Sequence, residues 1–343
     1  MAETLRSHLH WTSSPLIVNA AMGGFAGGRL AAAVTRAGGL GVIGAVMAND
    51  LEKELGIAAE ALKPTQKGDI IPIGVGLLPF IVQLDSVLPI LQRYRPAVVW
   101  LFAAKELTDY SIWAAKIRRV SPESRIWIQT GTVSAALKIA QSAKPDALIL
   151  QGADAGGHGF ERGASIVSLL PEATDVFKAN GLDNTPLLAS GGIADARGAA
   201  AAFALGASGV VLGTRFLAAN ETNAPPGYRE LVLAARDGAQ ATVRSKLFDN
   251  VKGPNIWPEA YDGRSLVTES YNDHVRGVDI DQVREVHNKA VTGEDSGYGK
   301  TNRANVWAGS GVGLVNKLED AADIVEEVRS GVTQILNSTN ARL

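Results

Sequence analysis

Short apolar runs recur along the first two thirds of the chain, and alanine-rich segments with helical spacing follow many of them. Because these runs are continuous rather than alternating with polar residues, they are typical of parallel strands that are buried on both faces. We predict eight strands, at Leu16–Ala21, Gly41–Ala45, Ile70–Gly76, Ala97–Phe102, Arg125–Gln129, Ala147–Gln151, Pro186–Ser190 and Gly209–Leu212. Helices are predicted between them, among others at Leu30–Ala37, Leu51–Leu62, Val133–Ala143 and Ala196–Leu205.

Eight strand–helix units in one chain predict an α/β fold of the (β/α)8 (TIM) barrel type. A doubly wound open sheet is the alternative, because one sequence does not reveal the order of the strands. We expect the barrel to occupy residues 1–220. Residues 221–343 are expected to form a C-terminal extension that packs on the barrel.

The extension has a different pattern from the barrel. Helices are predicted at Tyr228–Arg236 and Asp320–Gln334, and a polar stretch rich in Gly, Asn and Asp lies between them, from Phe248 to Gly311. This stretch holds six of the 20 aromatic residues of the chain. The six are Phe248, Trp257, Tyr261, Tyr271, Tyr298 and Trp307. The aromatic residues indicate either a small subdomain with its own core or a cap over the barrel mouth.

The amino-acid composition of the chain excludes several classes of function. The hydrophobic content of 46% is enough for a sizeable core, and a net charge of −2 provides no basic surface for nucleic acid. The chain has no cysteine, which excludes disulfides, thiolate nucleophiles and cysteine-bound metals. No apolar run approaches the ~20 residues of a membrane span. We expect a cytoplasmic protein, with a peroxisome as the alternative because Ala341-Arg342-Leu343 is a relaxed version of a peroxisomal address.

Glycine-rich turns follow the last two predicted barrel strands. Ser190, Gly191 and Gly192 come directly after the seventh strand, and Gly213 and Thr214 come directly after the eighth. In barrels of this type, phosphate is often held at these two strand ends. Glycine lets backbone N–H groups approach an anion, and a short helix that begins near Thr214 would direct its N-terminus at the phosphate. The pair of turns therefore predicts a phosphate site.

A histidine follows the sixth strand within a glycine-rich segment that runs from Gln151 to Gly159. Histidine titrates near neutral pH, so His158 can accept a proton from carbon or, when charged, hold an anion. Asp154 is a candidate to orient His158, although an Asp in a loop more often caps backbone amides. Gln129 and Gln151 each end a strand at the barrel mouth, where a carboxamide can donate and accept hydrogen bonds. We expect no metal site, because no metal-ligand spacing surrounds the other histidines, His8, His10, His274 and His287.

These segments together resemble the nitronate monooxygenase family, formerly called 2-nitropropane dioxygenases, and are closest to its fungal type. The resemblance covers roughly residues 15–329. Its most specific parts are Gln151 to Gly159, Ala189 to Asp195 and Gly213 to Phe216; Tyr261 to Arg264, Ser270 to His274 and Trp307 to Gly311 also take part. It implies FMN as cofactor, a (β/α)8 barrel, and the oxidation of alkyl nitronates, with nitroalkanes as further substrates, by O2 to carbonyl compounds and nitrite. A homo-oligomer is compatible with it.

The resemblance also implies roles for individual residues. It makes His158 the catalytic residue, and it places the cofactor against Ala21, Met22, Gly23, Gln129, Gln151, Gly156, Gly157, Ser190, Gly191, Gly192, Gly213 and Thr214. Two positions depart from the common family pattern: many members have Pro where this chain has Ala21, and many bacterial members have Asn where it has Gly76.

Three other functions remain open at this stage, because a barrel fold does not fix its chemistry. An FMN-dependent NAD(P)H:quinone reductase would use the same fold. An enoyl-thioester reductase would also need a site for an acyl carrier, and we find no basic patch for one. A protein that binds flavin or phosphate without catalysis would have no use for a titrating group such as His158.

Overall fold

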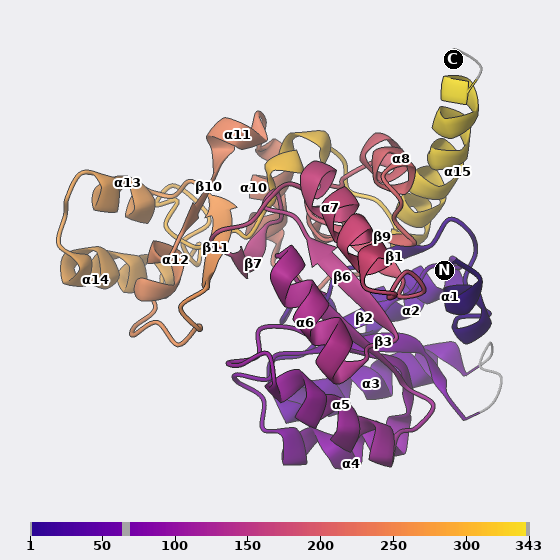
Figure 1. The fold of residues 1–343 in the computed structure, drawn as a ribbon. Helices are drawn as coiled ribbons and strands as arrows, with labels where there is room; N and C mark the ends of the chain where they lie inside the picture. Colours follow the sequence, from indigo (N-terminus) through magenta and orange to yellow (C-terminus); the bar gives the residue numbers. More distant parts are fainter. Residues whose placement is uncertain (1, 64–68, 341–343) are drawn as a thin grey trace.

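The computed structural model describes residues 2–63 and 69–340, and it contains the eight predicted strands in one parallel sheet (Figure 1). The order of the strands in the sheet is β1-β9-β8-β6-β5-β4-β3-β2, so strands that follow one another in the barrel portion are neighbours. This order is that of a (β/α)8 barrel, and it excludes the doubly wound sheet. The strands are β1 (Ile17–Asn19), β2 (Val42–Gly44), β3 (Ile71–Leu77), β4 (Pro96–Leu101), β5 (Arg125–Thr130), β6 (Ala147–Gln151), β8 (Leu187–Ser190) and β9 (Gly209–Leu212).

The barrel closes between β1 and β2. Val18 and Leu40 form a parallel bridge there. One residue further along, the buried side chain of Asn19 takes the place of a backbone partner for Val42 on β2. Its Nδ2 donates to the Val42 carbonyl at 2.8 Å, and its Oδ1 accepts from the Val42 N–H at 2.8 Å. A carboxamide can satisfy both backbone groups at once because it carries a donor and an acceptor.

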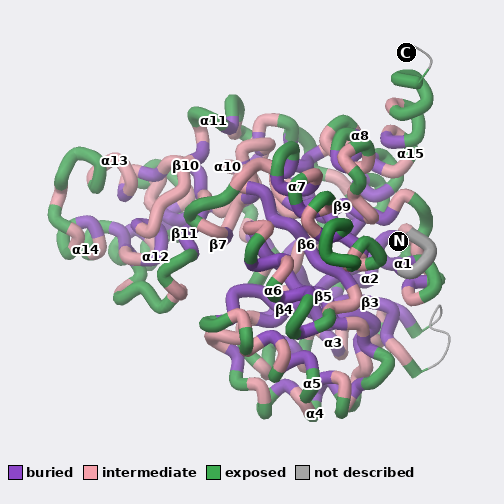
Figure 2. Tube along the Cα trace, viewed as in Figure 1, coloured by how far each residue is buried: buried purple, intermediate pink, exposed green. Residues whose placement is uncertain are grey.

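Helices that alternate with the strands cover the outside of the barrel and pack their apolar residues on it, and Figure 2 shows buried stretches within these helices. The alanine-rich sequences of α2, α6 and α8 allow close approach to the strands. Inside the barrel, Val98, Trp127 and their neighbours form a second core, into which Leu5 and Leu9 pack from the N-terminal segment. The covering helices are α2 (Gly28–Arg36), α3 (Ala48–Leu62), α4 (Leu84–Tyr94), α5 (Asp109–Val120), α6 (Val133–Ala143), α7 (Ile166–Ala179) and α8 (Ala196–Ala204).

The extension contains more regular structure than its polar sequence predicts. The orange helices at the left of Figure 1 project away from the barrel, whereas the final helix, α15 (Ala321–Asn340), returns to it and shares the outer core. The division at residue 220 remains a proposal. The other helices of the extension are α10 (Pro226–Ala234), α11 (Gly238–Ala241), α12 (Leu247–Asn250), α13 (Glu269–Val275), α14 (Ile280–Val291) and the 3-10 helix η1 (Ser310–Leu314).

The segment that carries His158 forms a strand, β7 (Gly157–Phe160), which is not among the strands that the sequence predicts. It joins β11 (Tyr261–Leu266) and β10 (Thr242–Ser245) in an antiparallel sheet, in which His158 pairs with Gly263. Barrel and extension are therefore joined through backbone hydrogen bonds at the very segment that presents His158.

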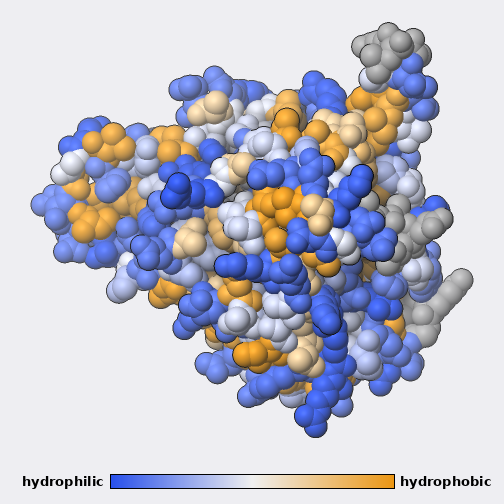
Figure 3. Space-filling view, in the orientation of Figure 1, coloured by the Kyte–Doolittle hydropathy of each residue, from blue (hydrophilic) through white to orange (hydrophobic). Residues whose placement is uncertain are grey.

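The molecular surface is mixed in character. In Figure 3, apolar patches are separated by hydrophilic side chains over the face that is shown. Among the helices of residues 2–63 and 69–340, none combines the length and apolar character that crossing a bilayer requires. The Ala341-Arg342-Leu343 tripeptide lies outside the described residues.

Candidate active site

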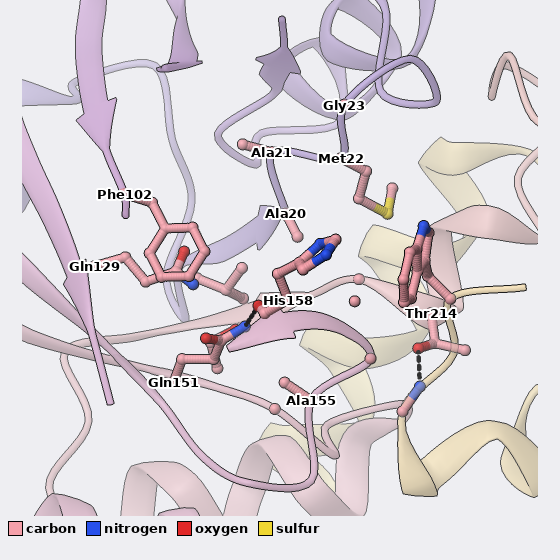
Figure 4. A pocket seen from close by; sticks show the side chains of 18 of the residues that line it. Ala20, Ala21, Met22, Gly23, Phe102, Gln129, Gln151, Ala155, His158 and Thr214 are labelled. Atoms are coloured by element: carbon pink, nitrogen blue, oxygen red, sulfur yellow. Dashed lines mark hydrogen bonds between the residues drawn. The ribbon is translucent and has the colours of Figure 1, made fainter. Parts of the chain in front are cut away.

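A cavity of about 360 Å³ opens at the carboxyl ends of the barrel strands (Figure 4). Parallel strands in a barrel place their carboxyl ends, and hence the residues that follow them, at one face. The predicted catalytic residue and all the predicted cofactor-binding residues line this cavity: Ala21, Met22, Gly23, Gln129, Gln151, Gly156, Gly157, His158, Ser190, Gly191, Gly192, Gly213 and Thr214. The structure thus brings together residues that are almost 200 positions apart in the chain.

His158 lies in the middle of this view, between Gln151 and Met22. Its Nε2 is 2.8 Å from Oδ1 and 3.0 Å from Oδ2 of Asp249, which lies on α12. Both partners are largely shielded from water, since 14% of the His158 side chain and 8% of the Asp249 side chain are exposed. A residue of the extension therefore holds the central histidine of the barrel cavity.

Two tryptophans of the extension enclose the imidazole. The ring of Trp257 is stacked on that of His158, with centroids 3.6 Å apart and planes 9° from parallel. Trp307 is tilted by 51° with its centroid at 4.7 Å. Gly263, opposite His158 in the small sheet, makes room for Trp307, because a Cβ at this position would lie 2.4 Å from the indole. The aromatic residues of the extension thus include a cap over the cavity.

The surroundings of His158 favour its neutral form. Burial lowers the pKa of His158, because a charged imidazole loses its hydration in this cavity, and the nearby cations Lys252 and Arg244 lower it further. Asp249 acts in the opposite direction and raises the pKa of His158, but it does not cancel the effect of burial. A neutral imidazole at neutral pH has a free lone pair and can act as a base.

Asp154 does not orient His158, contrary to the candidate role considered from the sequence. Its Oδ1 accepts a hydrogen bond from the Ser310 hydroxyl at 3.0 Å, and its backbone carbonyl accepts from the Ser310 N–H at 3.0 Å. The carboxylate is therefore used to attach the His158 segment to the extension. Close packing continues at Gly156, where a Cβ would lie 2.4 Å from the Ala308 carbonyl carbon.

The two glutamines at the strand ends are buried in the wall of the cavity. Gln151 donates from Nε2 to the carbonyl of His158 at 3.0 Å, which supports the β7 backbone. Its Oε1 is buried and has no hydrogen-bond partner within the described residues. A buried acceptor without a partner is costly, so Oε1 retains an unused capacity to accept a hydrogen bond. Gln129 is buried on the same cavity wall.

The glycine turns form the opposite end of the cavity. Gly191 and Gly192 have φ values of 104° and 73°, a left-handed backbone that favours glycine. Thr214 begins the short helix α9 (Thr214–Leu217), and its hydroxyl accepts from the Gly309 N–H at 3.0 Å. Next to it, the buried side chain of Arg215 is paired with Glu319 and Glu327. Any anion here would therefore be held by backbone N–H groups and the Thr214 hydroxyl.

The sequence points to His158 but does not reveal its two main neighbours, Asp249 and Trp257. Asp249 is 91 positions further along the chain, and no local motif connects the two residues. Trp257 was noted only as one member of an aromatic-rich stretch. Within residues 2–63 and 69–340, no group of three or more His, Asp or Glu residues is arranged to hold a metal ion.

Comparison with known proteins agrees with this geometry. A model of the nitronate monooxygenase family matches residues 120–331. The nitronate monooxygenase npaC of Metarhizium robertsii is 41% identical over 99% of this chain and 97% of its own length. The chain belongs to the nitronate monooxygenase family. Another member, the nitronate monooxygenase of Neurospora crassa, is 35% identical over 98% of this chain and 94% of its own length.

Solved structures share the fold of this nitronate monooxygenase family member. FabK from Thermotoga maritima superposes with a TM-score of 0.76 at 24% identity, over 99% of this chain and 98% of that one. A nitroalkane oxidase from Streptomyces ansochromogenes gives a TM-score of 0.73 at 22% identity, over 97% of this chain and 99% of that one. At these identities the likeness supports the barrel architecture alone.

The two departures from the common family pattern are neighbours in space. A Cβ at Gly76 would lie 2.3 Å from the Cβ of Ala21, so the strand β3 and the turn after β1 are in close contact here. A larger residue at position 76 therefore requires the turn at Ala21 to move.

Proposed function

We propose that this member of the nitronate monooxygenase family is an FMN-dependent enzyme that oxidises alkyl nitronates, and nitroalkanes after their deprotonation, with O2 to carbonyl compounds and nitrite. The observation that carries the proposal is the position of His158. A histidine whose pKa is lowered lines the same cavity as the glycine turns that follow β8 and β9. A base and an anion site thus face one another across a space suited to a cofactor and a small substrate.

The residues present fit FMN. Gln151 supplies a buried Oε1 without a partner, which suits an N–H group at the edge of the flavin ring. The turns at Gly192 and Gly213, with Thr214, suit its single phosphate, while Met22 and Gln129 would line the ring. When bound, FMN supplies the redox chemistry between the nitro substrate and O2.

The side chains of this chain supply proton transfer, position and the exclusion of water. His158 removes the α-proton of a neutral nitroalkane, and the electron pair of the broken C–H bond stays on the substrate as the nitronate anion. The imidazolium that results is held by Asp249 and can attract that anion. Trp257 and Trp307 cover the imidazole, so bulk water has little access to the proton in transit.

The test uses the purified protein and three measurements. We expect a yellow protein that releases FMN, and not FAD, on heating. Anaerobic addition of an alkyl nitronate should change the visible flavin spectrum, and the same addition in air should produce nitrite. Bleaching by NAD(P)H, with no spectral change on addition of the nitronate, would favour the reductase alternatives. A colourless protein that does not take up added FMN would contradict the proposal altogether.

A further inference from the structure

We propose that Asp249 is a positioning residue that holds His158 in the tautomer with its hydrogen on Nε2, so that Nδ1 is the nitrogen that accepts the substrate proton. The tautomer follows from geometry alone. Its kinetic consequence rests on the proposed function. A spectroscopic measurement tests the tautomer, and a kinetic comparison tests its consequence.

The hydrogen bonds between the two side chains determine the tautomer. Both oxygens of Asp249 lie within 3.0 Å of Nε2 of His158. An ionised carboxylate can only accept hydrogen bonds, so Nε2 has to be the donor. A neutral imidazole carries one N–H, and its other nitrogen then has a free lone pair. Because the pair is largely shielded from water, solvent competes little for either partner.

The surrounding rings direct the imidazole as well. Trp257 lies flat on one face of His158, and Trp307 approaches at an angle, so the edges of the ring are its accessible parts. His158 lines the cavity, whereas Asp249 lies outside the lining and contacts the Nε2 edge from α12. The opposite edge, with Nδ1, is therefore the one available to a substrate.

Asp249 has a second effect, which is to favour the positively charged form of His158. Lys252, which follows α12, and Arg244, on β10, both oppose a positive charge on the imidazole, and Asp249 favours one. Arg244 itself is paired with Asp262. As the C–H bond of the substrate breaks and the Nδ1–H bond forms, the ring becomes an imidazolium whose Nε2–H still points at Asp249. The carboxylate thus stabilises the charge that appears during proton transfer.

The direct test reads the tautomer by NMR of the holoenzyme labelled with 15N in its histidines. The chain has 5 histidines, and the signals that vanish in His158→Asn identify those of His158. We expect the neutral ring of the wild type to show a protonated Nε2 and a bare Nδ1. In Asp249→Asn, whose amide can donate to Nε2 as well as accept from it, the hydrogen should move wholly or partly to Nδ1. A wild-type Nδ1–H tautomer, or the same tautomer in both proteins, would overturn the inference.

The kinetic test compares a neutral nitroalkane with its preformed nitronate. Loss of a correctly positioned base costs about 10²–10⁴-fold, so Asp249→Asn should lower kcat/KM for the nitroalkane by about 10²-fold or more and for the nitronate by about tenfold at most. The acid limb of the nitroalkane pH profile should also move to lower pH, because the carboxylate that raises the pKa of His158 is gone. Asp249→Ala should behave in the same way.

Asp273→Asn is the matched control, because it neutralises another carboxylate of the extension, one that pairs with Arg276 and Arg303 and not with His158. It should leave the tautomer, the pH profile and the ratio of the two rates unchanged. Equal losses on both substrates in Asp249→Asn, with an unmoved pH profile, would make Asp249 a merely structural residue. If the wild type oxidises neither compound, the proposed function fails, and the NMR result still decides the tautomer.

Discussion

Trp257 of the extension lies flat on the imidazole of His158, with ring centroids 3.6 Å apart. The same indole contacts Phe80, in the segment after β3, with centroids 4.5 Å apart. One side chain thus connects the central histidine to a distant part of the barrel mouth. Trp257 thus forms the wall of the cavity beside His158, and this wall comes from the extension rather than from the barrel.

Replacing Trp257 tests this role. We expect Trp257→Ala to remove the stacking contact and widen the cavity beside His158, so that kcat/KM falls for small nitronates and falls less for bulky ones. The loss of an aromatic pair costs about 0.5–1.5 kcal/mol, which corresponds to an effect between roughly twofold and thirteenfold. Trp257→Phe, which keeps a ring, is the matched control and should stay close to the wild type. An unchanged preference between small and bulky substrates in Trp257→Ala would contradict the role.

The phosphate site is best tested at Gly213. A Cβ at this position meets only the Ala20 side chain, at 3.5 Å, which is ordinary contact, so Gly213→Val should fold. Its side chain should keep the phosphate from the backbone and raise the Kd for FMN by about tenfold or more, which is about 1.4 kcal/mol. Gly192 is less suitable, because its φ of 73° strains any other residue and a Cβ there lies 2.9 Å from Asp154.

Gly56→Val on α3 is the control for this experiment, since a Cβ at Gly56 also meets a single atom, at 3.6 Å, and Gly56 does not line the cavity. FMN affinity can be measured by fluorescence during titration of the apoprotein. Equal affinity in the Gly213 and Gly56 variants would show that the phosphate lies elsewhere.

The pH dependence follows from the lowered pKa of His158. Protonation removes the lone pair of the base, so activity on a neutral nitroalkane should be lost as the pH falls through the pKa of His158. Because burial puts this pKa below the usual 6.5, kcat/KM should be constant near neutral pH and decline only in more acidic solution. A profile from about pH 5 to about pH 8 checks this. A decline with its midpoint above 6.5 would show that the cavity does not favour the neutral ring.

The ion pairs of Arg215 connect the barrel to the final helix. The Arg215 side chain, 4% exposed, pairs with Glu319 and with Glu327 on α15. Arg215→Ala leaves both carboxylates paired with Lys317 alone, so the free energy of unfolding should fall by about 2 kcal/mol, the size of a hydrogen bond to a charged group. Calorimetry should show a fall in Tm. The exposed Arg197→Ala, which removes a solvated ion pair with Asp195, should change Tm little.

The sequence predicted the barrel and the cavity lining well because both depend on local patterns. A buried parallel strand is recognisable from its continuous apolar run, and the residues that follow each strand have to meet at one face. Gly191 and Thr214 were found in this way. The strand β7 was not, because the glycines around His158 are atypical of a strand and its partner β11 lies about 100 positions away. Contacts such as Asp249 with His158 depend on the folding of the extension, which carries no repeated pattern.

The central claim is that His158 is the base for neutral substrates, and His158→Asn tests it most directly. The measurement is kcat/KM for a nitroalkane and for its nitronate, side by side, in the wild type and the variant. We expect a loss of about 10²–10⁴-fold on the nitroalkane, a much smaller loss on the nitronate, which has already lost its α-proton, and an FMN content close to that of the wild type. Small and equal losses on both substrates would contradict the account and reduce His158 to a packing residue.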